Sequence, residues 1–138
     1  MKKIYSKIKK KKLLHIIFSP TKKNQRINIS PENEFMQLCY LKVNKENKFK
    51  AHKHFWKMNK QKTRIVQESW VLIKGSAKVS FYDLNDKFLT SKTLKPGDIS
   101  ITFEGGHKLD ILKNNTIIYE HKNGPYEGQT KDLKYLIK

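Results

Sequence analysis

Cysteine, arginine and long apolar runs are all scarce in this 138-residue chain. Cys39 is the single cysteine, which excludes an intramolecular disulfide and suits a reducing compartment. The apolar stretch of the N-terminal segment, LLHIIF, is too short for a membrane span or for the hydrophobic part of a signal peptide, and no small-residue cleavage site follows it. We therefore expect a soluble, cytoplasmic protein that does not associate with a membrane.

Arginine is represented only by Arg26 and Arg64, although Lys and Arg together number 30 against 12 Asp and Glu, for a net charge of +18. Proteins that read nucleic-acid sequence use the guanidinium fork for bidentate contacts to phosphate and guanine. A lysine excess spread over the whole chain is more typical of a solvated surface. Polyanion binding through the lysine-rich N-terminus therefore ranks lowest among the functions that we consider, and nucleic acid is not the expected partner.

Helical periodicity is also missing over any stretch of a dozen residues. Short strand-like segments recur instead, separated by residues that favour turns. The predicted strands cover residues 13–19, 35–43, 48–54, 68–75, 77–84, 88–94, 98–104, 107–113 and 116–122. They predict one all-β domain over residues 13–138, an antiparallel sandwich or barrel, preceded by a flexible lysine-rich arm over residues 1–12. The polar, proline-containing segment 19–34 is predicted to be a loop.

Histidines and one glutamate could form a metal site. His52 and His54 are one residue apart, so in a strand both side chains lie on the same face. Alternation along the strand 68–75 places Glu68 on the same face as Trp70, which we expect in the core, and a buried carboxylate is costly unless it is paired or binds a metal. The glycine turn in FEGGH then directs His107 toward the interior. Three imidazoles and a carboxylate suit Fe, Mn, Ni or Zn equally well.

These motifs resemble those of the cupin superfamily. The pair HKH, a glutamate separated by six residues from Gly75, and the segment KPGDISITFEGGH are similar to the two cupin motifs. The resemblance implies a small jelly-roll β-barrel, an antiparallel double sheet, that holds one divalent metal ion through His52, His54, Glu68 and His107. The gap between His54 and Glu68 is longer than in the common pattern, and FEGGH lacks the usual proline. We interpret residues 55–67 as a long hairpin loop at the mouth of the site, either a lid or a solvated flap.

The C-terminal segment carries a further resemblance. Its sequence EHKNGPYEG is similar to the closing segment of small bacterial cupins, among them WbuC-like proteins, which are often encoded with surface-polysaccharide or nucleotide-sugar genes. In such a barrel Glu120 would project inward on the same strand face as Ile118. It could be a further ligand, a general base, or a carboxylate paired with Lys122 or another cation. Tyr126 would pack the closing loop.

The resemblance implies a cytoplasmic metal-binding cupin that acts on a sugar or a small oxygenated metabolite, with Glu120 as the candidate proton acceptor. The alternative is a cupin that binds a ligand, or has a structural role, without catalysis. The sequence does not decide between an enzyme and a non-catalytic protein. The resemblance also implies a homodimer.

The remaining polar and aromatic residues have simpler interpretations. Trp70, Phe81 and Phe103 alternate as core residues, with Tyr82 and Tyr119 on the opposite faces. His15 and His121 are isolated and are predicted to lie on the surface or at a strand edge. Asp83 and Asp98 occur in turn sequences, where their side chains are predicted to accept hydrogen bonds from backbone amides.

Overall fold

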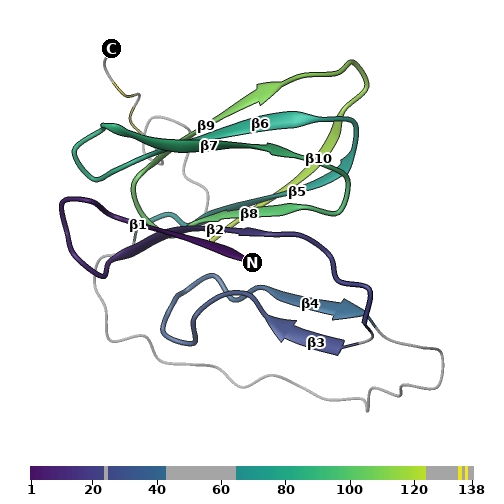
Figure 1. The fold of residues 1–138 in the computed structure, drawn as a ribbon, viewed down its shortest axis with the longest axis horizontal. Helices are drawn as coiled ribbons and strands as arrows, with labels where there is room; N and C mark the ends of the chain where they lie inside the picture. The colour runs from purple at the N-terminus through teal and green to yellow at the C-terminus, as the bar shows by residue number, and fades with distance from the viewer. Residues whose placement is uncertain (24, 43–64, 124–133, 135, 137–138) are drawn as a thin grey trace.

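The computed structural model describes residues 1–23, 25–42, 65–123, 134 and 136. Within these ranges the chain forms ten strands and no helix (Figure 1). The strands are β1 (Lys2–Tyr5), β2 (Leu13–Phe18), β3 (Gln25–Asn28), β4 (Cys39–Lys42), β5 (Glu68–Lys74), β6 (Ala77–Tyr82), β7 (Phe88–Leu94), β8 (Ile99–Thr102), β9 (Gly106–Ile111) and β10 (Ile117–Lys122). No helix in the described ranges has the length and apolar character that a membrane span requires.

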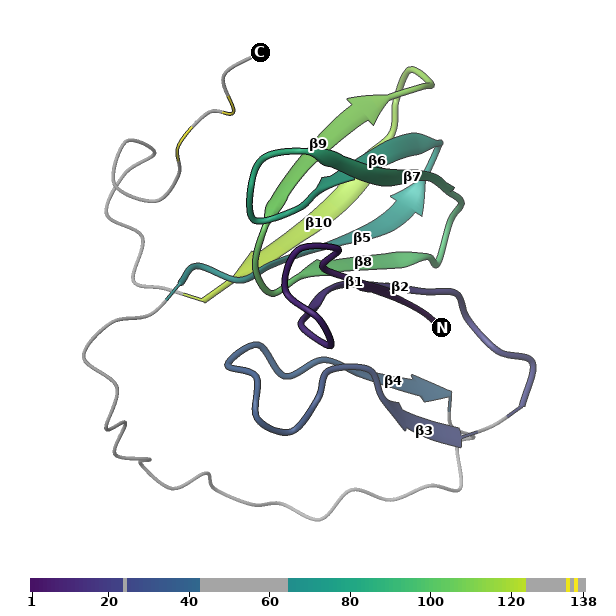
Figure 2. The ribbon, with the colours of Figure 1, turned by 60° about the vertical axis from the view of Figure 1, so that its left-hand side comes forward.

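The strands form three antiparallel sheets that lie in layers (Figures 1 and 2). A five-stranded sheet with the order β1-β2-β8-β5-β10 lies in the middle. The three-stranded sheet β7-β6-β9 covers one of its faces, and the hairpin β3-β4 covers part of the other. The prediction of an all-β fold with antiparallel pairing is therefore confirmed, and in the described part of the chain the three sheets remain separate rather than closing on one another.

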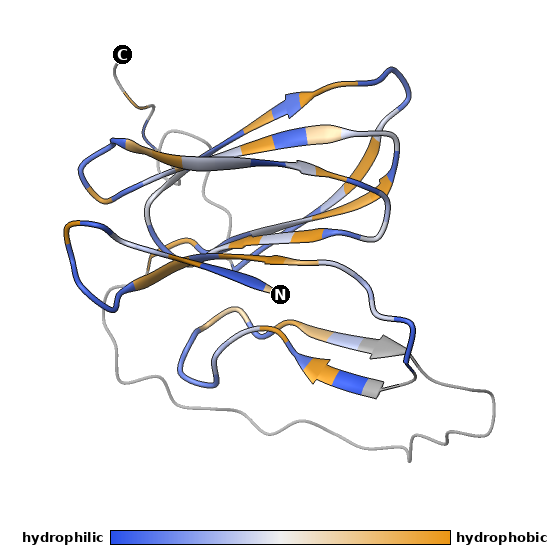
Figure 3. Ribbon diagram, viewed as in Figure 1, coloured by the Kyte–Doolittle hydropathy of each residue, from blue (hydrophilic) through white to orange (hydrophobic). Residues whose placement is uncertain are grey.

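Each face of the middle sheet has its own apolar core. Between the middle sheet and β7-β6-β9, the first core contains Trp70, Leu72 and Phe81. Between the middle sheet and the β3-β4 hairpin, the second core contains Phe18, Ile101 and others. Because β2 is covered on both faces, its sequence LLHIIF is an almost continuous apolar run, which Figure 3 shows in orange.

The segment 1–12 differs from the prediction of a flexible arm. Residues Lys2–Tyr5 form β1, which pairs with β2, and the side chain of Ile4 is buried in the first core. The turn that follows is held by the buried carboxylate of Asp83, which accepts hydrogen bonds from the Ser6 hydroxyl (2.6 Å) and from the Lys7 amide (2.7 Å). The start of the basic segment is thus part of the sheet, and residues 7–12 lie in the turn that joins β1 to β2.

The predicted loop 19–34 also contains a strand. Gln25–Asn28 forms β3 and pairs with β4, which lies within the predicted strand 35–43. The predicted strands of residues 68–122 are all present, with ends that differ by no more than a few residues. The predicted strand 48–54 lies outside the described residues.

Candidate functional site

A row of polar residues crosses four neighbouring strands of the middle sheet. His15 of β2 is paired with Thr102 of β8, Thr102 with Glu68 of β5, and Glu68 with Lys122 of β10. Glu68 lies two positions from Trp70, so its side chain is on the face that turns toward the β7-β6-β9 sheet. The interior between these two sheets is therefore polar at this end and apolar around Trp70 and Leu72.

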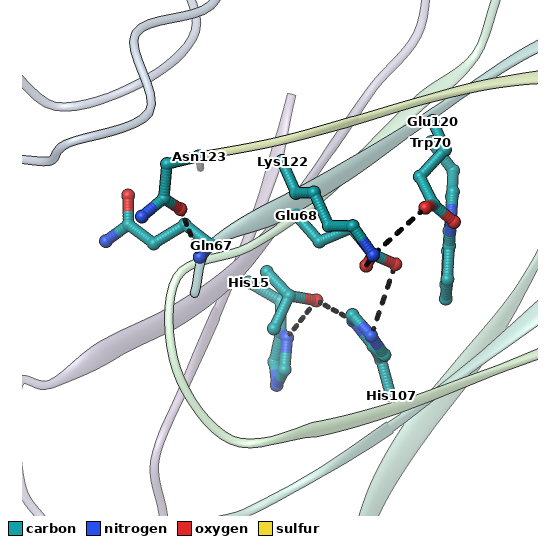
Figure 4. Close-up of polar contacts among 9 residues, drawn as sticks. His15, Gln67, Glu68, Trp70, His107, Glu120, Lys122 and Asn123 are labelled. Carbon is teal, nitrogen blue, oxygen red and sulfur yellow. Dashed lines mark hydrogen bonds and ion pairs between the residues drawn. The ribbon is translucent and has the colours of Figure 1, made fainter. Parts of the chain in front are cut away.

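His107 faces this row from the opposite sheet. It is the second residue of β9 and follows the bend at residues 103–105, in which Gly105 adopts a φ of 86°, a backbone conformation that residues other than glycine rarely adopt. A Cβ atom at Gly105 would lie 2.6 Å from the Tyr82 carbonyl oxygen, so this position requires glycine. The turn directs His107 inward, where its Nε2 lies 3.5 Å from Glu68 Oε1 and its ring packs on Trp70, with centroids 4.4 Å apart (Figure 4).

A single hydroxyl joins two imidazoles in the interior. Thr102 Oγ1 lies 2.8 Å from His107 Nδ1 and 3.1 Å from His15 Nδ1 (Figure 4). The other ring nitrogen of His15, Nε2, is 3.3 Å from the Tyr82 carbonyl oxygen. His15 is fully buried and packs against Phe81, so its prediction as a surface or strand-edge residue is wrong. The reason is that β2 lies between β1 and β8, and therefore is not an edge strand.

Glu120 lies beside this cluster on β10. Its carboxylate accepts a hydrogen bond from Trp70 Nε1 (3.0 Å), and its other oxygen lies 3.5 Å from Lys122 Nζ. Lys122 Nζ is also 4.0 Å from Glu68 Oε2, so one ammonium group lies between two carboxylates. Glu120 thus pairs with Lys122, which is one of the roles that the sequence suggested. The Glu120 side chain is half-exposed and is not enclosed in the interior.

Burial determines the protonation of the cluster. Burial, and to a smaller extent the negative charge of Glu120, raise the pKa of Glu68 to about 7, against the opposing effect of Lys122. Burial lowers the pKa of His107 to about 4, and it likewise lowers the pKa of His15 to about 4. Both imidazoles are therefore neutral at pH 7, and Glu68 is close to its point of half-protonation.

A pocket of about 390 Å³ opens beside these residues. Glu68, Thr102 and His107 line one part of its wall, and Leu84, Gly105 and Leu136 line another. Glu120 and Lys122 do not belong to the lining. A small molecule in the pocket would thus contact Glu68 and His107 directly, while Glu120 could act on it only through a neighbouring group.

The structure brings together two of the four residues that the sequence suggested as metal ligands, Glu68 and His107. His52 and His54 lie outside the described residues, as do Tyr126 and most of the loop 55–67. In the described part of the chain, no group of three or more His, Cys, Asp or Glu side chains is arranged to hold a metal ion.

Two residues of the cluster were missed from the sequence, His15 and Thr102. A signal for Thr102 is present in the strand DISITFE, where alternation sets Ser100 and Thr102 opposite Ile99, Ile101 and Phe103. Two small polar residues that face the side of Trp70 indicate a polar patch inside the sandwich. No comparable signal marks His15, because its partners are 67 and 87 positions away in the sequence.

No protein-family model, curated protein or solved structure matches the chain.

Proposed function

We propose that the protein is a cupin that binds one divalent metal ion between the two larger sheets, through Glu68 and His107 together with His52 and His54. The supporting observation is the convergence of Glu68 Oε1 and His107 Nε2 at 3.5 Å in a largely buried site. The antiparallel layers, with a polar cluster between them, are compatible with the jelly-roll barrel that the motifs suggest.

The described pair fits such an ion. Ligand atoms at 2.0–2.2 Å from a tetrahedral Zn²⁺ are about 3.4 Å apart. The observed 3.5 Å between the glutamate oxygen and the histidine nitrogen thus needs little movement to accept a metal. A neutral imidazole and a carboxylate are also donors that Fe, Mn, Ni and Zn all accept, so the pair does not select among these metals.

The chemistry that we propose follows from these residues. When bound, the metal would act as a Lewis acid on a carbonyl or hydroxyl oxygen of a small molecule, or as an oxygen-activating iron centre. The pocket of about 390 Å³ is large enough for a sugar or a small oxygenated metabolite, the ligand class that the cupin resemblance suggests. Glu120, held by Trp70 and Lys122 beside the pocket, remains the proposed proton acceptor, and it would take the proton through a neighbouring group because it does not line the pocket. A role in surface-polysaccharide or nucleotide-sugar metabolism, and a homodimer, rest on the resemblance alone.

Metal content tests this proposal. The protein purified without chelator is expected to contain about one equivalent of metal, measured by mass spectrometry of the elements. Glu68→Ala and His107→Ala should lose it, and His52→Ala should lose it as well. His121→Ala is the matched control, because His121 is an exposed histidine on β10. Folded protein without metal, or variants that keep the wild-type metal content, would overturn the proposal.

A second function is favoured by Lys122. Its ammonium group already lies near both Glu68 and Glu120 and supplies a positive charge that a metal would otherwise provide. The alternative is a metal-free cupin that binds its ligand without catalysis. The two functions differ in the Lys122→Met variant, since a metal site gains affinity for a cation when a neighbouring ammonium is removed, whereas a metal-free site gains none.

A further inference from the structure

We infer that His15 and Thr102 are positioning residues that fix the tautomer of His107, so that its Nε2 presents an unprotonated lone pair to Glu68 and the pocket. The chain of contacts runs from the Tyr82 carbonyl through His15 and Thr102 to His107 (Figure 4 labels the two histidines). This inference concerns the metal-free protein and does not rest on the proposed function.

The direction of the chain is set at its first contact. The Tyr82 carbonyl oxygen can only accept a hydrogen bond, so His15 Nε2, 3.3 Å away, carries the proton. His15 is fully buried, so its ring is shielded from bulk solvent. Desolvation keeps the ring neutral, because a buried imidazolium would need a compensating negative charge. A neutral ring with a proton on Nε2 has a bare Nδ1, which accepts a hydrogen bond.

The hydroxyl of Thr102 passes this constraint on. It has one proton, and it donates that proton to His15 Nδ1 at 3.1 Å. The oxygen can therefore only accept in its shorter contact with His107 Nδ1, at 2.8 Å. His107 Nδ1 carries a proton as a result, and in a neutral ring Nε2 is then bare. This bare nitrogen is the atom that lies 3.5 Å from Glu68 Oε1.

The arrangement matters because the two tautomers have opposite properties at the pocket. With the proton on Nδ1, the pocket-facing Nε2 can accept a proton or bind a cation. With the proton on Nε2, the same atom could only donate a hydrogen bond to Glu68. Partners that hold the distal nitrogen of a histidine in this way typically change metal affinity 10–100-fold when they are removed. The pairs His15–Thr102 and Thr102–His107 span three strands, so the fold itself holds the tautomer.

The tautomers are measured by NMR of ¹⁵N-labelled, metal-free protein near pH 8, through long-range ¹H–¹⁵N correlations of the imidazole rings. We expect a proton on Nε2 of His15 and on Nδ1 of His107. A proton on Nε2 of His107 in the wild-type protein overturns the inference without any variant.

Three substitutions test the transmission. Thr102→Val removes the hydroxyl and keeps the shape, so His107 should change to the Nε2-protonated form. Thr102→Ser keeps the hydroxyl and should keep the Nδ1-protonated form. His15→Phe removes the acceptor of the Thr102 proton, which frees the hydroxyl to donate to His107, and the Nδ1-protonated fraction should fall. An unchanged His107 tautomer in folded Thr102→Val overturns the inference.

Titration with Zn²⁺ separates this inference from the proposed function. If both are correct, Thr102→Val binds Zn²⁺ 10–100-fold more weakly than the wild-type protein, and Thr102→Ser binds it about equally well. If the NMR result is as expected and no protein binds Zn²⁺, the proposed metal site fails and the positioning role stands. If Thr102→Val changes the tautomer of His107 but binds Zn²⁺ as tightly as the wild-type protein, the tautomer does not control metal binding, and this consequence of the inference is overturned.

Discussion

Glu68 and His107 face each other from two different sheets, with a carboxylate oxygen and an imidazole nitrogen 3.5 Å apart. They are brought together by two local features of the sequence. Alternation along β5 turns Glu68 to the same side as Trp70, and the glycine turn before β9 directs His107 inward. The carboxylate and the imidazole are both desolvated in the same place, and their pKa values shift toward the neutral forms.

The first prediction concerns stability against pH in the presence of a chelator. His15 and His107 have pKa values of about 4 in the folded protein, below the ordinary 6.5. Between these two pH values the unfolded chain therefore binds two more protons at these histidines than the folded protein does. Glu68, raised from 4.5 to about 7, gives the folded protein one more proton over nearly the same range. The net difference is one proton. The free energy of unfolding should fall by about 1.4 kcal/mol per pH unit as the pH decreases from 6.5 to 4.5.

Glu68→Gln sharpens this test. Glutamine cannot bind the extra proton that Glu68 binds in the folded protein, so the unfolded chain then binds two more protons than the folded protein. The change in the free energy of unfolding should approach about 2.7 kcal/mol per pH unit. Asp86→Asn, a change at an exposed carboxyl, should leave the slope as in the wild type. Urea unfolding at several pH values provides the measurement. Equal slopes for wild type and Glu68→Gln would show that Glu68 is ionised in the folded protein.

The second prediction concerns Lys122. Its ammonium lowers the pKa of Glu68, against the effects of burial and of Glu120. Lys122→Met keeps the length of the side chain and removes the charge, so the pKa of Glu68 should rise above its present value of about 7. Titration of ¹³C-labelled carboxyl groups by NMR measures this directly. Lys108→Met is the control, because Lys108 pairs with Asp110 on the surface. A lower or unchanged pKa in Lys122→Met would contradict the geometry of the cluster.

Much of the fold could be predicted from the sequence, because most strands show two local signals, an alternating or apolar pattern and flanking turn residues. Segments such as FLTSKTL and AKVSFY alternate or are apolar, and turn residues separate them. Lys2–Tyr5 lacked these signals, since β1 is an edge strand with a single buried side chain, Ile4, and charged residues are common on edge strands. Gln25–Asn28 lacked them too, because β3 covers the middle sheet with only one face.

The site could be predicted only where one strand or one turn determines the direction of a side chain. That condition holds for Glu68 and for His107. It does not hold for His15, which gains its role from the strand order β2-β8-β5, and strand order comes from contacts between distant segments. A histidine inside an apolar run has the same local sequence whether its strand lies at an edge or at the centre of a sheet.

The third prediction compares two glycines with left-handed backbone conformations. Gly105 and Gly97 have φ values of 86° and 88°, so alanine at either position is strained to a similar extent, by about 1–2 kcal/mol. Only at Gly105 would the added Cβ meet a backbone oxygen, that of Tyr82, at 2.6 Å, and lie 3.3 Å from His15 Nε2. At Gly97 it would meet the Pro20 side chain. Gly105→Ala should therefore shift the ¹⁵N resonances of the His15 ring, and Gly97→Ala should not. Identical His15 resonances in both variants would contradict the close packing of this turn.

The last prediction concerns Asp83, which holds the lysine-rich turn to the sandwich. Its carboxylate is buried and accepts hydrogen bonds from the Ser6 hydroxyl and from the amides of Lys7 and Leu84. Asp83→Ala leaves these donors without an acceptor and should lower the free energy of unfolding by about 3 kcal/mol or more. Asp110→Ala is the control. It should cost less than about 1 kcal/mol, because the Asp110 carboxylate pairs with Lys108 on the surface.

Hydrogen exchange locates the effect of Asp83→Ala in the structure. The β1 amides are held by pairing with β2, and the turn at Ser6 fixes the start of that pairing. Without Asp83 the Ser6 amide, which donates to the Lys12 carbonyl, and the β1 amides that point to β2 should exchange faster relative to those of β6. Local opening of a terminal strand needs less free energy than global unfolding. Uniformly faster exchange throughout the chain would mean that Asp83 supports the whole sandwich rather than this hairpin, and wild-type exchange in β1 would mean that the pairing with β2 holds the basic segment by itself.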